Sequence, residues 1–381
     1  MKLLIENLNK DDKYVELKNK LKLKSSINNF STIGLTDSAK AMFVYSISKE
    51  LDKSSVIVCH NVYQANRIIQ DLKFYSDDIE IIFLPSKSIE YYDIETESNE
   101  IETQRAYAIE SILSQKQNIV VTTIDSLLLN MNARSSFNKL DLSIKIGEKI
   151  NVEEFLNNLV ELGYERSQIA EGKGQVAVRG GIIDIFTVNN ELPYRIELFG
   201  NEVDNIRTYD PLTQRSIDTV KKVDISYAKT NHITNNKVKE IVDALNKLIE
   251  REDINSELKI NLMKDIEKLE NKTLENVFDK YFEFFKNSSE TLIDYLKDYN
   301  IFIDEPSKCI EKARNIVYEN EESLKVFASR NYIYLPYANK YLNFEDVLEK
   351  LSKMKNVYME RICIDNDLHK GRECYTIYTR E

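Results

Sequence analysis

The sequence contains few of the residues that build metal sites and disulfide frameworks. Its 381 residues include four cysteines and three histidines. The cysteines, Cys59, Cys309, Cys363 and Cys374, form no C-x-x-C pair, and no histidine lies at metal-site spacing from them. His60 directly follows Cys59, but adjacent residues of a strand point to opposite faces. The sequence therefore predicts a reduced chain without a bound metal.

Long apolar runs and an excess of positive charge are also missing. No stretch approaches membrane-spanning length, and the start, MKLLIENLNKDDKY, lacks the features of a signal peptide. The chain has 52 Lys and Arg against 63 Asp and Glu, a net charge of −11. Such a chain suits a protein partner better than a phosphate backbone. We expect a cytoplasmic protein without membrane contact, long enough for two or three domains.

Residues 26–137 alternate short apolar segments with amphipathic ones. This pattern is typical of a parallel sheet with helices on both faces, the α/β architecture of a RecA-like nucleotide-binding lobe. The expected strands are 29–34, 55–59, 79–84 and 118–122, and the expected helices are 38–51, 63–74 and 100–115.

The first strand-to-helix turn departs from the phosphate-loop pattern GxxxxGK[ST]. Gly34 and Lys40 match, but Ala39 replaces the second glycine and Ala41 replaces the hydroxyl residue that binds magnesium. The loop loses backbone freedom without that glycine, and Asp37 adds a carboxylate where anions would bind. We interpret the turn as a phosphate loop that has lost its function. Weak nucleotide binding and a coincidental turn are the alternatives.

Residues 138–228 follow a different pattern, runs of strand with one helix, which predicts a separate α+β unit. A strand is expected at 140–144, a helix at 148–162 and a closing strand at 223–226. Between them lie short strands separated by the turns Gly180-Gly181, Asn189-Asn190 and Gly200-Asn201.

One strand of this unit, YRIELF at residues 194–199, has two distinct faces. Its Tyr, Ile and Leu fall on one face and form a core side, whereas Arg195, Glu197 and Phe199 fall on the other. Arg and a large aromatic residue on an exposed sheet face are typical of a protein-binding hot spot. The alternative is a slightly apolar outer face, or one that another part of the chain covers.

The same region carries a family resemblance. VRGGIIDIF and PYRIELFGNEVDNIRTYDPLTQRS resemble the inserted domain shared by the UvrB helicases and the transcription-repair coupling factors. The resemblance covers roughly residues 26–370 and is strongest over 174–216. It implies a degenerate RecA-like lobe formed by two chain segments, 1–137 and 229–381, with 138–228 as the inserted UvrA-binding domain.

Two features favour the coupling factors over UvrB. The UvrB family keeps an intact phosphate loop, whereas the coupling factors have a degenerate one. Tyr91-Tyr92-Asp93 resembles the start of UvrB's DNA-gripping hairpin, but an acidic run follows at once and leaves no room for the hairpin. That run is Glu95, Glu97, Glu100 and Glu102. We interpret it as a solvated helix start, where carboxylates are favourable, and an active-site role for these carboxylates is the alternative.

The second segment of the lobe begins with charged helical sequence. Residues 236–300 have apolar side chains three and four apart, and we expect the aromatic run YFEFF to lie in a helix core rather than to stack on nucleic acid. An apolar strand at 300–303 then ends in Asp304-Glu305, the position of an ATPase's magnesium-binding carboxylates. In the coupling factors a DEP sequence stands here as a relic, so we expect a structural role. Helix 307–318, strand 332–335 and helix 344–355 should complete the lobe.

The resemblance implies a non-catalytic module without a cofactor that recruits the repair protein UvrA to stalled transcription complexes. The resemblance implies that Arg179, Arg195 and Phe199 contact UvrA, and Arg179 must pair alongside to join the other two. The full-length family is an ATP-dependent DNA translocase that binds RNA polymerase and duplex DNA through domains absent from this chain. Holding that motor inactive is a compatible role. The alternative is a UvrB-type ATP-dependent DNA helicase that verifies damage.

Overall fold

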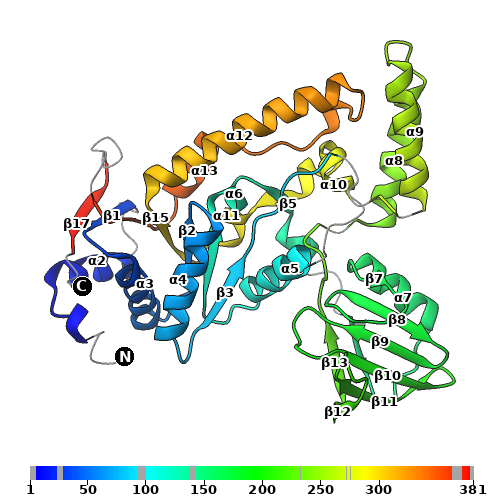
Figure 1. Ribbon diagram of the computed structural model, residues 1–381, viewed down its shortest axis with the longest axis horizontal. Coiled ribbons are helices and arrows are strands. Elements are labelled where there is room, and N and C mark those ends of the chain that lie inside the picture. The colour runs from blue at the N-terminus through cyan, green and yellow to red at the C-terminus, as the bar shows by residue number, and fades with distance from the viewer. Residues whose placement is uncertain are drawn as a thin grey trace.

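The computed structural model describes residues 6–23, 29–91, 100–137, 142–231, 233–271, 273–274, 276–362 and 371–377. Two sheets organise these residues: a seven-stranded sheet whose strand pairs are all parallel, and a six-stranded, mainly antiparallel sheet that lies apart from it (Figure 1). The predicted α/β class is confirmed. No helix in these ranges is long and apolar enough to cross a membrane.

The seven-stranded sheet is assembled from both segments of the lobe. Its strands are β1 (Asn29–Ile33), β2 (Ser55–Cys59), β3 (Glu80–Leu84), β4 (Asn118–Thr123), β15 (Asn300–Asp304), β16 (Asn356–Glu360) and β17 (Glu373–Thr376). Their order, β17-β1-β16-β15-β2-β4-β3, places β15 and β16 between β1 and β2. Every residue of β2, β4, β15 and β16 is buried, as expected for the centre of a parallel sheet.

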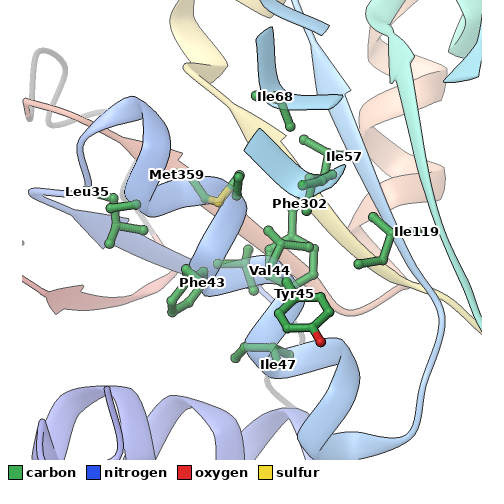
Figure 2. Close-up of a cluster of buried hydrophobic side chains, with 14 of the residues drawn as sticks. Leu35, Phe43, Val44, Tyr45, Ile47, Ile57, Ile68, Ile119, Phe302 and Met359 are labelled. Carbon is green, nitrogen blue, oxygen red and sulfur yellow. The ribbon is translucent and has the colours of Figure 1, made fainter. Parts of the chain in front are cut away.

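Helices cover both faces of this sheet. On one face lie α2 (Asp12–Lys22), α3 (Asp37–Leu51) and α4 (Val62–Tyr75). On the other lie α5 (Glu100–Leu113), α6 (Ile124–Leu127), α11 (Leu292–Tyr295), α12 (Pro306–Ser329) and α13 (Phe344–Ser352). Figure 2 shows the first of these cores, where Phe43 of α3 lies against Phe302 of β15 with a ring separation of 6.1 Å. The helix therefore packs directly on a strand from the distant second segment.

The six-stranded sheet has the order β12-β11-β10-β9-β8-β7. Its strands are β7 (Glu165–Arg166), β8 (Gln175–Arg179), β9 (Ile182–Phe186), β10 (Tyr194–Phe199), β11 (Glu202–Tyr209) and β12 (Ser216–Thr219). Helix α7 (Val152–Glu161) covers one face, together with the two-stranded pair β6 (Leu142–Lys145) and β13 (Lys222–Ile225). Gly180 and Gly200 close two hairpins with φ values of 61° and 64°, a conformation that glycine adopts without steric cost.

Helix α7 begins later than predicted. The expected helix started at 148, but the side chain of Asn151 accepts hydrogen bonds from the backbone N–H groups of Glu153 and Glu154. An N-cap of this kind satisfies amides that have no partner inside the helix, so Val152 is the first helical residue. Residues 138–141, the start of the strand expected at 140–144, lie outside the described ranges.

The helical segment forms a hairpin, α8 (Asn235–Ile249) and α9 (Ser256–Glu270), that projects from the lobe (Figure 1). The continuous helix expected through the aromatic run is wrong, because α9 ends at Glu270 and a short helix, α10 (Val277–Lys280), and a 3-10 turn at Phe282–Phe284 follow. The expected core role is right for Tyr281 and Phe285, which are buried in the hairpin's hydrophobic cluster. Further on, β14 (Ser289–Thr291) pairs with β5 (Asn130–Asn132) where helix was expected.

Three other predictions of the second segment are corrected. The strand expected at 332–335 does not form: the chain makes a 3-10 turn at Leu335–Tyr337, where Pro336 supplies no N–H for a strand pair. Helix α12 extends to Ser329 instead of 318, because Leu324 in the added turns is buried in a cluster with Ile333. The helix expected to reach 355 ends at Ser352, and the unpredicted β16 follows.

The acidic run after Tyr91 is only partly described, because Tyr92, Asp93, Glu95 and Glu97, like Cys363, lie outside the described ranges. Glu100 is exposed at the start of α5, as predicted. Glu102 contradicts the prediction of a solvated helix start. Its side chain is 13% exposed and pairs with Lys87 at 2.9 Å. Burial opposes its charge, but Lys87 and Arg105 outweigh this and lower the pKa of Glu102 to about 2.

Candidate partner-binding site

The outer side of the six-stranded sheet is partly covered by the chain around Ala170, as one of the alternatives predicted, and it contains a buried carboxylate. Asp184 lies on β9 opposite Arg195 of β10 and opposite Ala177 of β8. Its side chain is 1% exposed and accepts two hydrogen bonds from Arg195, Nε to Oδ1 at 2.7 Å and Nη2 to Oδ2 at 2.8 Å. Arg179 donates a further bond from Nη2 to Oδ2 at 2.8 Å. The sheet therefore brings the two predicted arginines together through a shared anion.

Arg195 is also held from its other sides. Its guanidinium stacks on the ring of Tyr209, 4.3 Å from the centroid, and Nη2 donates to the side-chain oxygen of Gln214 at 2.8 Å. The hydrogen bonds with Asp184 raise the pKa of Arg195 above its usual value. Its side chain is 16% exposed, against 50% for Arg179. Arg195 is thus fixed in one orientation, whereas Arg179 keeps more of its surface open to solvent.

The predicted aromatic residue is exposed to solvent. Leu198 packs against the core of this unit, and Phe199, the next residue, is 84% exposed at the end of β10. Ile196 is completely buried, and Tyr194 packs against the same core. The predicted division of the strand into a core face and an outer face is confirmed. We call the outer surface that carries Arg179, Asp184, Arg195 and Phe199 the partner face.

Sequence reasoning missed two features of the partner face. Asp184 was not singled out, although a carboxylate inside the apolar run IIDIF is the kind of signal that indicates a buried ion pair. Leu212, which is 93% exposed, lies in the loop that also supplies Gln214. The sequence gives little indication that Leu212 belongs to a binding surface, because a single apolar residue in a polar turn is common.

Arg195 pairs with Asp184 and not with Glu197 of its own strand. Glu197 pairs with Arg207 of the neighbouring strand, whereas Arg195 reaches across to β9. The difference follows from register, because Asp184 is directly opposite Arg195 in the antiparallel pair. Arg195 therefore belongs to a mostly buried network and not to the solvated surface.

The turn from Gly34 to Ala41 lies at the carboxyl edge of the seven-stranded sheet, as predicted for a phosphate loop. Gly34 has a φ of 99° and donates its N–H to the carbonyl of Glu360. Ala41 is completely buried and Ala39 is 8% exposed, and both belong to the hydrophobic core under α3. Asp37 is paired with Arg67 at 2.7 Å. The two alanines thus contribute to packing.

Lys40 is occupied by the two carboxylates of the second segment. Its Nζ lies 2.6 Å from Asp304 Oδ1 and 2.6 Å from Glu305 Oε1, and its side chain has no exposed surface. Burial alone would lower the pKa of Lys40, but the charges of Asp304 and Glu305 outweigh this and raise it. Lys40 is therefore held as a cation by residues 264 and 265 positions further along the chain.

The chain is similar to proteins of known families. Residues 142–230 match the family model of the UvrB interaction domain. The transcription-repair-coupling factor of Bacillus subtilis (strain 168) is 29% identical over 297 residues, 76% of this chain and 25% of that protein. Those of Staphylococcus aureus (strain bovine RF122 / ET3-1) and Staphylococcus epidermidis (strain ATCC 12228) are each 28% identical, over 83% and 92% of this chain. The chain spans 25 to 30% of the length of these three relatives.

Proposed function

We propose that this chain, a UvrB-like module similar to that of the transcription-repair-coupling factors, recruits the repair protein UvrA through its partner face. The observation that carries the proposal is the ordered pair of arginines beside an exposed phenylalanine. Asp184 fixes Arg195 and Arg179, so little side-chain entropy is lost when they bind. Arg side chains are frequent hot spots of protein interfaces, and aromatic side chains are enriched there.

The proposal assigns the three residues different tasks. Phe199 is exposed and can bury its ring in an apolar pocket of UvrA without leaving a polar group unsatisfied. Arg179 is half exposed and can donate to a carboxylate or carbonyl of the partner. Arg195 offers less free surface, and its main contribution is to neutralise Asp184 and keep the face in register.

We further propose that the module does not hydrolyse ATP. Lys40 would have to leave Asp304 and Glu305 before it could reach a phosphate, and the buried carboxylate of Asp304 and the half-buried one of Glu305 would then face the incoming anion. The alternative, a UvrB-type ATP-dependent helicase, requires a lysine that is free for the nucleotide. We therefore give Gly34, Ala39, Lys40, Ala41, Asp304 and Glu305 a structural role.

We also propose a division of the chain into a lobe and an inserted domain. Segments 1–137 and 229–381 form the lobe, and 138–228 is the inserted domain that binds UvrA. In a longer protein the RNA polymerase and DNA contacts would belong to other regions. An intramolecular partner of the same face could also keep such a protein inactive until UvrA is needed.

A titration of this chain with purified UvrA tests recruitment. Phe199→Ala and Arg179→Ala should each weaken binding by about 2 kcal/mol, roughly thirtyfold in Kd, with little change in stability. Phe74→Ala is a matched control, because Phe74 is 77% exposed on α4 of the other sheet. Ile196→Ala, on the core face, should instead destabilise the domain by about 2–5 kcal/mol. Wild-type affinity in both partner-face variants would overturn the proposal.

A further inference from the structure

A basic pocket lies at the amino edge of the seven-stranded sheet, opposite the turn that holds Lys40. It has a volume of about 850 Å³ and lies between the ends of α2 and α3 and the segments around α11 and α13. Lys53 and Lys355 stand just before β2 and β16 and belong to its wall. The charged lining consists of one aspartate, Asp294, and six lysines: Lys22, Lys53, Lys297, Lys350, Lys353 and Lys355. This local excess of positive charge stands out in a chain of net charge −11.

Two of the six lysines are neutralised by carboxylates. Lys350 pairs with Asp294 at 2.8 Å, and Lys353 pairs with Glu349 at 2.6 Å on the exposed side of α13. The remaining four lysines, Lys22, Lys53, Lys297 and Lys355, form no ion pair within the ranges that the structure describes. The pocket is therefore lined by several lysine side chains that are not paired with a carboxylate.

The partners of Lys53 and Lys355 are neutral. Lys355 Nζ donates to the carbonyls of Leu21 and Leu23 at the end of α2, the second at 2.6 Å, and Lys53 donates to Asn300 Oδ1 at 3.1 Å. Burial lowers the pKa of both lysines, and the charge of Lys53 lowers that of Lys355 further. Asp298 opposes this effect at Lys53. The two ammonium groups are thus partly desolvated and repel each other.

A structural explanation for these lysines accounts for part of the charge. The helices α2, α3, α11 and α13 end around the pocket, and each helix C-terminus carries a partial charge of roughly −0.5. The ends together contribute at most about −2, less for the one-turn helix α11, whereas four lining lysines have no paired carboxylate. Dipole compensation therefore leaves a net positive pocket.

We propose that this pocket binds a compact polyanion that carries several phosphate groups. Lysine ammonium groups are point charges that suit phosphate oxygens without a fixed geometry. The volume matches that of a small-molecule site, which favours a compact ligand over an extended nucleic acid. Of the apolar lining residues, Leu21, Ile293 and Tyr299 are buried and Leu51 and Met354 are half-buried, so the lysines supply the polar groups that a ligand meets. The site is independent of the partner face.

Calorimetric titration of the full chain with sodium tripolyphosphate, without magnesium and at constant ionic strength, tests the proposal. Wild-type protein should bind one tripolyphosphate, and Lys22→Gln/Lys297→Gln should bind it at least tenfold more weakly. Both lysines are exposed and make no described ion pair, so the fold should be kept, which circular dichroism checks. Lys239→Gln/Lys312→Gln is the matched control, with the same charge change on exposed positions of α8 and α12.

Several outcomes would overturn the proposal: no binding to wild-type protein, equal weakening in the control variant, or tighter binding of a 12-nucleotide single strand than of tripolyphosphate. Excess magnesium adds a further distinction. It should weaken binding in the lysine pocket by neutralising the phosphates, whereas a phosphate-loop site needs the metal. UvrA affinity should be unchanged in Lys22→Gln/Lys297→Gln. Failure of polyphosphate binding and failure of UvrA recruitment are thus separate results.

Discussion

Asp184 of β9 lies directly opposite Arg195 of β10 and holds its guanidinium through hydrogen bonds of 2.7 and 2.8 Å. The same carboxylate also accepts a bond from Arg179, so one buried charge positions both arginines of the partner face. Bidentate bonds of this type fix the plane of the guanidinium as well as its place. The partner face is therefore organised by a residue that a partner can hardly touch, since the side chain of Asp184 is 1% exposed.

Removing that carboxylate should weaken both the fold and the binding of UvrA. Asp184→Ala leaves Arg195 largely buried without its counter-charge, and we expect a loss of about 2–4 kcal/mol in the free energy of unfolding. UvrA affinity should fall with it, because both arginines lose their orientation. Urea denaturation and calorimetry measure the two effects. Asp218→Ala, at an exposed position of β12, should change neither. Unchanged UvrA affinity in a folded Asp184→Ala variant would show that the arginines do not need this anchor.

Lys40 should be a stability residue rather than a nucleotide ligand. In Lys40→Met the carboxylate of Asp304, which has no exposed surface, loses its cation, and we expect a cost of about 3–5 kcal/mol at pH 7. Burial already raises the pKa of Asp304, and without Lys40 it should rise further. The folded variant then binds a proton more readily than the unfolded chain, so its deficit should shrink as the pH falls through that raised pKa. Urea denaturation at pH 7 and pH 5 tests this, with Lys312→Met, at an exposed position of α12, as control. A deficit that grows on acidification would contradict the assignment.

Magnesium-ATP should not stabilise the protein. A ligand at a hundred times its dissociation constant adds about 2.7 kcal/mol of stability, so a working nucleotide site would raise the melting temperature visibly. Differential scanning fluorimetry with excess magnesium is the measurement, and ATP without magnesium distinguishes the lysine pocket. A magnesium-dependent rise that Lys40→Met abolishes would favour the helicase alternative.

Glu102 should make the fold sensitive to acid. Its pKa is lowered to about 2 because the attraction of Lys87 and Arg105 outweighs the effect of burial. A depressed carboxylate pKa contributes stability above the unfolded value of about 4.3, and the contribution is lost as the pH falls from there towards 2. Glu102→Gln should therefore cost about 3 kcal/mol at pH 7 and almost nothing at pH 2. Glu100→Gln, at the exposed neighbouring position, is the control. A cost for Glu102→Gln that is independent of pH would indicate that packing, and not charge, is responsible.

Local pattern determined much of this protein. Apolar runs such as SVIVC specify buried strands, because burial on both faces of a parallel sheet selects continuous apolar sequence. The alternation along 194–199 correctly assigned Ile196 to the buried face and Phe199 to the outer face. Successive side chains of a strand point to opposite faces, so the outer face is set once the buried face is known. The turn at Gly34 and the carboxylates Asp304-Glu305 were each placed at the ends of strands from sequence alone.

Tertiary structure decided which of these residues meet. Lys40 and Asp304 are 264 positions apart, and they form an ion pair because β15 enters the sheet beside β2 and not at its edge. Asp184 reaches Arg195 through strand register, which the hairpin geometry sets and the composition of either strand does not. The strand missed at 356–360 and the false strand at 332–335 have the same cause. A short apolar segment becomes a strand only where a neighbouring strand satisfies its backbone, and that neighbour is distant in sequence.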